Sequence, residues 1–453
     1  MLTGRARKKE YTLVMLLALV LLITAFLWST DLIQTPAVYA AAVQELTLGQ
    51  SSQGRPIMAV RFGTGSRKLV VVGDTHGGPE ANTYILTTQL IDHFRADPGE
   101  VPASVSLYLI PTINPDGLAL GSRFDANGVD LNRNMNTDLD DCSENDWSPH
   151  VQGAYGIESD TGGPYPESEV ESRLIRDFLL DASGAIFLHS NAGLVFPAFC
   201  QHQPSIEMGM VYAQAAGYQY NRYWPNYMIT GGMHDWAGSL GIAAIIPELV
   251  TGDSSEYAAN LAGLQAVLAK ADQLLPLPED HYEAGLRVPA LIWRFWKAHG
   301  GMARFGPPLT FAMQHDSFTE QVFERAILEL HPDRVGTSDL VQLAPLMHVD
   351  TNHAFAPVTP DGVTQFFPET GHTLREIFQI YWQQNDGQQL FGPPISEEFE
   401  MLTADGQRRT VQYFKRAIFS YHAEDGSVHL EPVGWSALVR EQLLAPTLAF
   451  QIR

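Results

Sequence analysis

The sequence predicts an α/β fold, a mixed, largely parallel sheet flanked by helices, followed by a duplicated α+β module near the C-terminal end. Between residues 45 and 275, short apolar segments alternate with stretches of helical periodicity, which is typical of parallel strands joined by crossover helices. After residue 285 this alternation ends, and one aromatic and Gly-Pro pattern occurs twice. We therefore expect a larger first domain and a smaller repeated module.

Each expected element of the first domain has its own signal. The strand segments are short and rich in Val, Ile and Leu, as strands buried on both faces require. They are 57–62, 69–72, 105–110, 185–188 and 243–246. The helix segments, which carry apolar residues at helical spacing, are 81–94, 167–180, 206–216 and 256–275. The Pro-containing stretch 276–284 ends the last helix and is expected to be a linker.

Residues 285–440 are predicted to form the duplicated module. Phe305-Gly306-Pro307-Pro308 recurs as Phe391-Gly392-Pro393-Pro394, and Phe323-Glu324-Arg325-Ala326 recurs as Phe414-Lys415-Arg416-Ala417. Two copies roughly 90 residues apart favour one duplication over a solenoid. Because the module holds no obvious cluster of catalytic groups, we expect it to bind or to act as a spacer. Its ligand could be a cell-surface or wall polymer.

Charge restricts the classes of partner. The chain has 28 Lys and Arg residues against 51 Asp and Glu residues, and a formal net charge of -23. Such acidity argues against nucleic acids and anionic membranes as binding partners.

The N-terminus, residues 1–40, has the pattern of an export signal. Basic residues between positions 5 and 9 precede an apolar run from Leu13 to Trp28, and small residues lie near Ala40. A cleaved signal peptide and an uncleaved membrane anchor are both compatible with this run. Either one predicts that the remainder is extracellular. Cys142 and Cys200 could then pair, although two cysteines imply no disulfide framework.

A histidine and a carboxylate follow the segment 69–72 closely. His76 and Glu80 are separated by Gly77-Gly78-Pro79, at the point where a buried strand gives way to a helix. In an open α/β sheet, ligands bind outside the carboxyl ends of the strands. We therefore expect the functional site at this position.

Five stretches, in order, resemble the zinc metallocarboxypeptidase family, the carboxypeptidase A-like peptidases. The resemblance spans roughly residues 45–275 and leaves the C-terminal third outside it. It implies the metallocarboxypeptidase-like version of the predicted fold. It also implies a zinc metallopeptidase that hydrolyses C-terminal peptide bonds. The stretches are His76–Glu80; Asn114–Gly117 with Arg123; Gly128–Asn134; Leu188–Asn191; and Tyr227–Trp236, continuing to Leu249.

By this resemblance, His76, Glu80 and His189 bind one zinc ion per catalytic domain and leave a fourth position for water. The family usually separates the first two ligands by two residues, whereas three separate them here. Two glycines, and Pro79 at a first helical position, make the longer spacing feasible. Asp130 is expected to hydrogen-bond the first histidine and fix its tautomer. A plain turn aspartate fits its position equally well.

The resemblance also implies which residues act on the substrate. Glu248 would serve as the general base, and Arg123 would stabilise the oxyanion. Asn132, Arg133 and Tyr227 would bind the terminal carboxylate of the peptide. His234 falls in the pocket for the C-terminal side chain. Because it is neither acidic nor aliphatic, it predicts no clear residue preference.

Two alternatives stay open beside a secreted carboxypeptidase. One is a peptidase of the same class that cuts peptidoglycan stem peptides. The other is a non-catalytic surface-binding protein, in which the longer His-to-Glu spacing has abolished metal binding. A serine hydrolase is poorly supported, since the sequence has no Gly-x-Ser-x-Gly motif.

Overall fold

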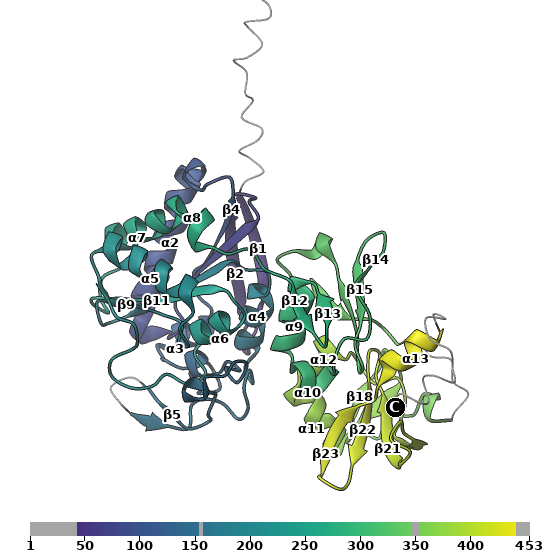
Figure 1. Ribbon diagram of the computed structural model, residues 1–453. Coiled ribbons are helices and arrows are strands. Elements are labelled where there is room, and N and C mark those ends of the chain that lie inside the picture. The colour runs from purple at the N-terminus through teal and green to yellow at the C-terminus, as the bar shows by residue number, and fades with distance from the viewer. Residues whose placement is uncertain (1–42, 154–156, 347–352, 441–453) are drawn as a thin grey trace, which may run out of the picture. The chain divides into compact units, whose positions relative to one another are not determined.

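The computed structural model describes residues 43–153, 157–346 and 353–440 (Figure 1). The predicted export signal, residues 1–40, lies outside these ranges. Among the described residues, no helix combines the length and apolar character needed to cross a membrane. The chain from Glu45 onward forms one compact unit.

The first part of this unit is organised around one mixed sheet of nine strands. The strand order is β1-β2-β4-β3-β7-β11-β9-β10, and β8 also pairs with β11. The centre is parallel, because β3 runs parallel to both β4 and β7, and β7 runs parallel to β11. Antiparallel pairs are β2 with β4 and β9 with β11. The strands are β1 (Val43–Gln50), β2 (Pro56–Phe62), β3 (Arg67–Val72), β4 (Val105–Ile110), β7 (Gly184–Phe187), β8 (His189–Ser190), β9 (Leu194–Pro197), β10 (Gln219–Tyr220) and β11 (Ala243–Leu249).

Helices cover both faces of the sheet, which confirms the predicted fold class. Neighbouring residues of a strand face opposite sides. Ile246 of β11 joins the core cluster that contains Trp236, whereas Ile245 lies against Gly209 on the other side. The helices are α2 (Ala81–Ala96), α3 (Pro115–Leu120), α4 (Val170–Leu179), α5 (Gln203–Ala216), α6 (Met233–Ser239), α7 (Tyr257–Ala269) and α8 (Ala271–Leu274), and a separate small hairpin is formed by β5 (Val151–Gln152) and β6 (Glu158–Ser159).

Several elements differ from the prediction. The helix expected at 167–180 begins only at Val170, because Glu167 has a positive φ of 59° and Glu169 is extended. The helix expected at 256–275 is interrupted at Lys270, which separates α7 from α8. The short strand β9, which runs antiparallel to β11 and parallel to β10, was not predicted.

The predicted linker, 276–284, is shorter than expected. Its last residues form β12 (His281–Glu283), which pairs antiparallel with β13 (Leu286–Val288). Ala284 and Gly285, which join these strands, both have positive φ. That backbone is favoured in two-residue hairpin turns because its twist matches the twist of the strands. The C-terminal part therefore starts with a hairpin at His281.

The C-terminal part contains two copies of one unit, each made of a hairpin, two helices and a four-stranded antiparallel sheet. The first copy has β12, β13, α9 (Ala290–Ala298), α10 (Gly301–Phe305), β14 (Met313–Gln314), β15 (Thr319–Val322), β16 (Ile327–Leu330) and β17 (Val341–Leu343). The second has β18 (Gln365–Phe367), β19 (His372–Leu374), α11 (Glu376–Gln384), α12 (Gly387–Leu390), β20 (Phe399–Leu402), β21 (Arg408–Tyr413), β22 (Ile418–His422) and β23 (Ser427–Leu430), followed by α13 (Val433–Arg440).

The repeated sequence motif has the same structural role in both copies. The indole of Trp296 donates to the carbonyl of Gly306 at 3.1 Å, and that of Trp382 donates to Gly392 at 2.9 Å. These glycines belong to the Phe-Gly-Pro-Pro sequences, so each motif closes its turn against its own helix. The recurring residues therefore maintain the fold of the unit.

The two copies also make equivalent contacts with each other. After the first sheet, the amide of Leu346 donates to the carbonyl of Lys415 in the second copy. After the second sheet, the amide of Gly434 donates to the carbonyl of Glu324 in the first copy. Because Glu324 and Lys415 occupy matching positions of the motif, the exchange is reciprocal.

Candidate active site

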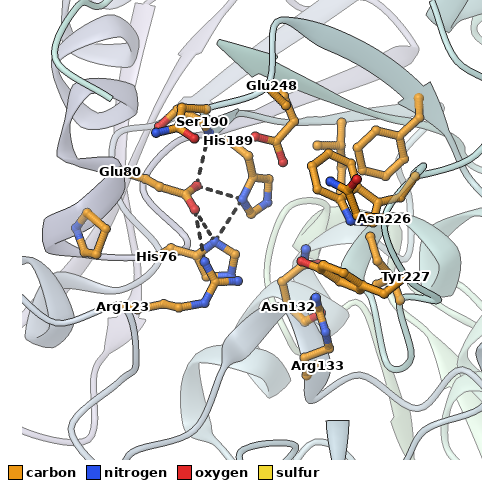
Figure 2. Close-up of a pocket in the computed structure, with 17 residues that line it drawn as sticks. His76, Glu80, Arg123, Asn132, Arg133, His189, Ser190, Asn226, Tyr227 and Glu248 are labelled. Atoms are coloured by element: carbon orange, nitrogen blue, oxygen red, sulfur yellow. Dashed lines mark hydrogen bonds and ion pairs between the residues drawn. The ribbon is translucent and has the colours of Figure 1, made fainter. Parts of the chain in front are cut away.

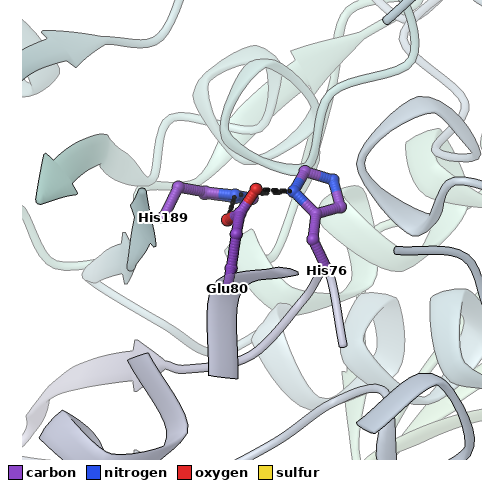
Figure 3. A group of neighbouring side chains, drawn as sticks. All are labelled: His76, Glu80 and His189. Carbon is purple, nitrogen blue, oxygen red and sulfur yellow. Dashed lines mark hydrogen bonds and ion pairs between the residues drawn. The ribbon is translucent and has the colours of Figure 1, made fainter. Parts of the chain in front are cut away.

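Two histidines and a glutamate converge at the carboxyl ends of β3 and β7 (Figure 3). His76 follows β3 by four residues, and His189 opens β8, directly after Leu188. Glu80 lies 2.7 Å from His76 Nδ1 through Oε1 and 2.9 Å from His189 Nδ1 through Oε2. All three side chains are buried. The structure thus gathers the three residues predicted as metal ligands.

Tight packing of the Gly77-Gly78 turn explains how the longer His-to-Glu spacing is accommodated. Gly77 has φ 32°, and a Cβ added there would lie 2.0 Å from the carbonyl oxygen of Ser122. A Cβ on Gly78 would lie 2.4 Å from the backbone of Gly121. Only glycine allows so close an approach of two backbones. Pro79 follows in the first turn of a short 3-10 helix, which brings Glu80 back toward His76.

Asp130 fixes the orientation of the first histidine. Its Oδ1 lies 2.9 Å from His76 Nε2, and its Oδ2 accepts from Arg123 Nε at 3.0 Å. Although burial opposes ionisation, Arg123 and His76 hold the pKa of Asp130 well below its usual range. An ionised Asp130 accepts a hydrogen bond from the Nε2–H of His76, so the lone pair of His76 lies on Nδ1, which faces Glu80 and His189.

The donor set fits a metal ion. The Nδ1 atoms of His76 and His189 are 3.1 Å apart. Ligand atoms about 2.0–2.1 Å from a tetrahedral zinc ion are separated by roughly 3.3 Å. Burial lowers the pKa of His189 to about 4, so its imidazole is neutral at pH 7, as a metal ligand must be. The Nδ1 atoms of the two histidines and the carboxylate of Glu80 face one another, and one cation can bind all three.

Glu248 lies on β11, directly opposite His189 in the strand register. Its Oε2 is buried and makes no hydrogen bond with any described residue. Figure 2 shows its carboxylate turned toward the same cavity as His189. Burial and the charge of Glu80 raise the pKa of Glu248 to about 8. A second carboxylate, free of protein partners, therefore faces the possible metal position.

The residues predicted to bind a terminal carboxylate line the same cavity, which has a volume of about 500 Å³ (Figure 2). Arg133 is held by the carbonyls of Asn132 and Gln152, and its guanidinium carbon lies 5.7 Å from the centre of the Tyr227 ring. The amide oxygen of Asn132 accepts from the backbone of Met233. Arg123 also lines the cavity and contacts Glu80 at 3.2 Å.

His234 faces a second cavity, of about 410 Å³, which shares Phe196, Trp224 and Tyr227 with the first. The imidazole is 2% exposed, its edge lies against the Phe196 ring, and burial lowers its pKa. Its Nδ1 makes no hydrogen bond within the described ranges. The other walls are mainly apolar and aromatic.

Several residues that line the first cavity were not singled out from the sequence. They include Ser190, Trp224 and Asn226. Ser190 directly follows His189, and its amide donates to Glu80 Oε2 at 3.2 Å. Trp224 and Asn226 precede Tyr227. Proximity in sequence to predicted residues was the signal available for all three, but their orientation depends on the loops.

An α/β sheet that gathers two imidazoles and two carboxylates in one cavity is characteristic of metal-dependent hydrolases. The chain belongs to the zinc carboxypeptidase family, whose model matches residues 31–284. Members of this family are zinc metallopeptidases that act on peptides. The resemblance described for the sequence is thereby confirmed.

Individual relatives are distant. Carboxypeptidase B of Astacus astacus is 28% identical over 193 residues, which are 38% of this chain and 58% of the relative. Carboxypeptidase A2 of Mus musculus is 25% identical over 280 residues, 52% of this chain and 62% of the relative. The chain thus spans less than two thirds of either relative. A solved structure of bovine thrombin-activatable fibrinolysis inhibitor has 18% identity and a TM-score of 0.42, and the match covers 52% of this chain and 90% of that one.

Proposed function

We propose that this protein is an exported zinc carboxypeptidase that removes residues from the C-terminus of peptides. One observation carries the proposal. The three possible ligands, His76, Glu80 and His189, line the same cavity as the unpartnered Glu248 and the cationic Arg133. A hydrolytic group and a carboxylate-binding group within one cavity define an exopeptidase.

The contacts of each residue indicate its role in hydrolysis. His76, Glu80 and His189 would hold the zinc ion, which would supply Lewis-acid chemistry and activate water for attack. Glu248, whose Oε2 has no hydrogen-bond partner among the described residues, accepts the proton of the attacking water and passes it to the leaving amine. Arg123, oriented by Asp130, donates to the oxygen that becomes negative in the transition state.

The free end of the substrate is bound on the opposite wall of the cavity. Arg133 presents a planar guanidinium that can hold a carboxylate in bidentate fashion, and Asn132 adds an amide donor. Tyr227 lies over Arg133 and is positioned to cover the bound end. An amidated peptide has no charge at this position, and it should bind poorly.

The second cavity supports a preference for apolar or aromatic C-terminal side chains. Phe196, Phe199, Trp224 and Met228 supply its apolar surface. Burial lowers the pKa of His234, so its imidazole is neutral at pH 7 and adds no positive charge to the cavity. The one carboxylate among the lining residues, Asp235, already accepts from the amide of Phe199 and lies 3.2 Å from His234 Nε2. Burying a further charged side chain without a free partner is strongly unfavourable.

Export is supported by the basic and apolar N-terminal residues and by the Cys142–Cys200 disulfide. Disulfides persist mainly in oxidising compartments. The extracellular location, and any polymer bound by the duplicated module, remain part of the proposal.

A peptide library incubated with and without chelator tests the proposal. We expect loss of single C-terminal residues from free-carboxylate peptides, inhibition by chelator and recovery on adding zinc. Peptidoglycan stem peptides belong in the same library, and their exclusive cleavage would favour the wall-specific alternative. Zinc content is measured in parallel. A protein that stays zinc-free in excess zinc, and cleaves nothing, would be the non-catalytic binding protein instead.

A further inference from the structure

A second group of acidic side chains lies apart from the candidate active site. Asp125, Glu169 and Glu171 each offer a carboxylate oxygen, and these oxygens lie within 4.8 Å of one another. Asp125 is 3% exposed, Glu169 4% and Glu171 0%. Three carboxylates so close together and so deeply buried repel one another strongly unless something neutralises them.

No basic side chain neutralises this group. Within the described ranges, none of the three forms an ion pair with Lys, Arg or His. Arg55 pairs with Asp116 at 2.6 Å, and burial together with the charge of Asp116 raises the pKa of Glu171. The known partners are neutral: Ser52 donates to Glu171, and Asn127 and Ser168 donate to Glu169.

Two oxygens of the group are unpartnered. Asp125 Oδ1 accepts from the amides of Asn127 and Val129, but its Oδ2 accepts from no described donor. Glu171 Oε1 accepts from Ser52, whereas its Oε2 has no partner. Unpartnered buried carboxylate oxygens are rare in folded proteins because desolvation is not compensated. Two such oxygens in one group of three close carboxylates indicate a bound positive species.

We propose that Asp125, Glu169 and Glu171 bind a calcium ion that is distinct from the zinc of the active site. Carboxylate oxygens suit hard divalent cations, whereas zinc prefers sites that include nitrogen or sulfur. Calcium tolerates irregular sets of oxygen ligands, while magnesium demands near-octahedral geometry and retains several waters. A buried, irregular set of carboxylates therefore favours calcium.

The ion would join two segments that are far apart in the sequence, the loop that carries Asp125 and the start of α4. Asp125 belongs to the loop between Arg123 and Asp130, Glu169 immediately precedes α4, and Glu171 holds the Ser52 turn after β1. Asn134 is bonded to the same region through Ser168 and Glu169. Calcium would thus stabilise the loop that carries the substrate-binding residues, without contact with the substrate.

The competing occupant is a proton. Burial, followed by a hydrogen bond to Glu169, raises the pKa of Asp125 to about 8, so the two carboxyl groups can share one proton. A shared proton satisfies this pair but leaves Glu171 Oε2 unpartnered. A bound calcium ion and a shared proton can be distinguished by experiment. Added calcium should raise the Tm only if the group binds a cation.

Thermal unfolding of the zinc-loaded protein, titrated with calcium chloride, tests the proposal. We expect a saturable rise in Tm of roughly 2–4 °C, with a smaller effect of magnesium, because a ligand bound only by the folded state stabilises it. Isothermal titration should give one calcium per chain, with zinc content unchanged. Neither readout depends on peptidase activity.

Two variants locate the effect. Asp125→Asn and Glu171→Gln retain an acceptor for the existing backbone donors but remove a negative charge, and each should weaken calcium binding by at least tenfold. Asp92→Asn, which removes an exposed charge on α2, should leave the titration unchanged. A wild-type protein that binds no calcium would overturn the proposal. Undiminished binding by both site variants would overturn it equally, as would an equal loss in Asp92→Asn.

Discussion

Two glutamates of one cavity differ because of their neighbours. Despite its burial, Glu80 is held ionised by His76 and His189, which keep its pKa below the usual range. Glu248 has no such partners, and burial together with the charge of Glu80 raises its pKa to about 8. Opposite shifts of two nearby carboxyls are a common basis for dividing acid–base roles. Glu80 is therefore suited to bind a cation, and Glu248 to exchange a proton.

Replacing Glu248 with Gln should lower kcat by about 100- to 10,000-fold, the usual contribution of a general base. The amide preserves the shape of the side chain but cannot accept the proton of water. Zinc content should match that of the wild type, since Glu248 is not among the three converging ligands. Near-normal kcat in a zinc-loaded variant would remove Glu248 from the proposed mechanism.

Replacing Arg133 with Ala should weaken cleavage of peptides with a free C-terminus much more than cleavage of amidated ones. A lost charge-assisted, bidentate contact is worth about 1.5–3 kcal/mol, or roughly 10- to 150-fold in kcat/KM. Arg133 also donates to the carbonyl of Gln152, so unfolding must be measured alongside. Arg133→Lys, which keeps the charge without the planar fork, serves as the comparison. Equal losses on both substrates would contradict an exopeptidase site.

The sequence predicted most of the residues that line the first cavity, but it did not predict the buried acidic group. His76, Glu80 and His189 follow apolar strands, and Glu248 lies near the end of another. The carboxyl ends of parallel strands in an α/β sheet meet at one edge. The acidic group of Asp125, Glu169 and Glu171 was not foreseen. Its members lie in a loop and at a helix start whose mutual approach depends on tertiary packing, and acidic residues at such positions are usually exposed.

At the scale of elements, the turn between β3 and α2 determines whether Glu80 reaches the two histidines. Gly77 and Gly78 pack against the backbone of the 117–122 segment, which leaves no room for side chains. Helix starts were also the least predictable boundaries. The helix expected from residue 167 starts at Val170 because Glu167 has a left-handed backbone, and its side chain binds Arg176 instead. Local periodicity carries no information about such contacts.

Replacing Gly77 with Ala should reduce zinc affinity and lower Tm. The new Cβ would overlap the carbonyl oxygen of Ser122, so the turn must shift and carry His76 or Glu80 away from the ligand position. Positive φ alone costs about 1–3 kcal/mol for a residue other than glycine. Gly54→Ala is a matched control, because Gly54 has φ 78° and nothing within 4 Å of the added Cβ. It should lose stability without losing zinc. Equal zinc affinity in the two variants would contradict this role of the turn.

At the scale of the whole molecule, the duplicated module is bonded to the sheet-containing part by buried polar groups. Arg294 of α9 is 3% exposed and donates to the carbonyls of Leu180 and Ala182. Arg176 of α4 pairs with Asp386 of the second copy at 3.0 Å. Trp293 and Trp296 belong to the same core cluster as residues of the large sheet. The sequence predicted two regions. It could not predict these contacts between them, because the sequence pattern of one region carries no information about the residues it meets in the other.

A chain that ends after Pro278 should therefore be less stable, although its active site is complete. Every residue that lines the first cavity precedes position 249, so kcat/KM for a small peptide, measured per zinc-loaded and folded chain, should stay within about twofold of the wild type. Stability should fall, because truncation uncovers apolar surface that α9 covers in the full-length chain and removes the hydrogen bonds that Arg294 donates to the carbonyls of Leu180 and Ala182. Arg294→Gln in the full-length chain isolates the polar part of this loss and should lower Tm less than truncation does. An unchanged Tm after truncation would mean that the module is an independent domain, and a large fall in kcat/KM of the folded fragment would mean that the module shapes the cavity itself.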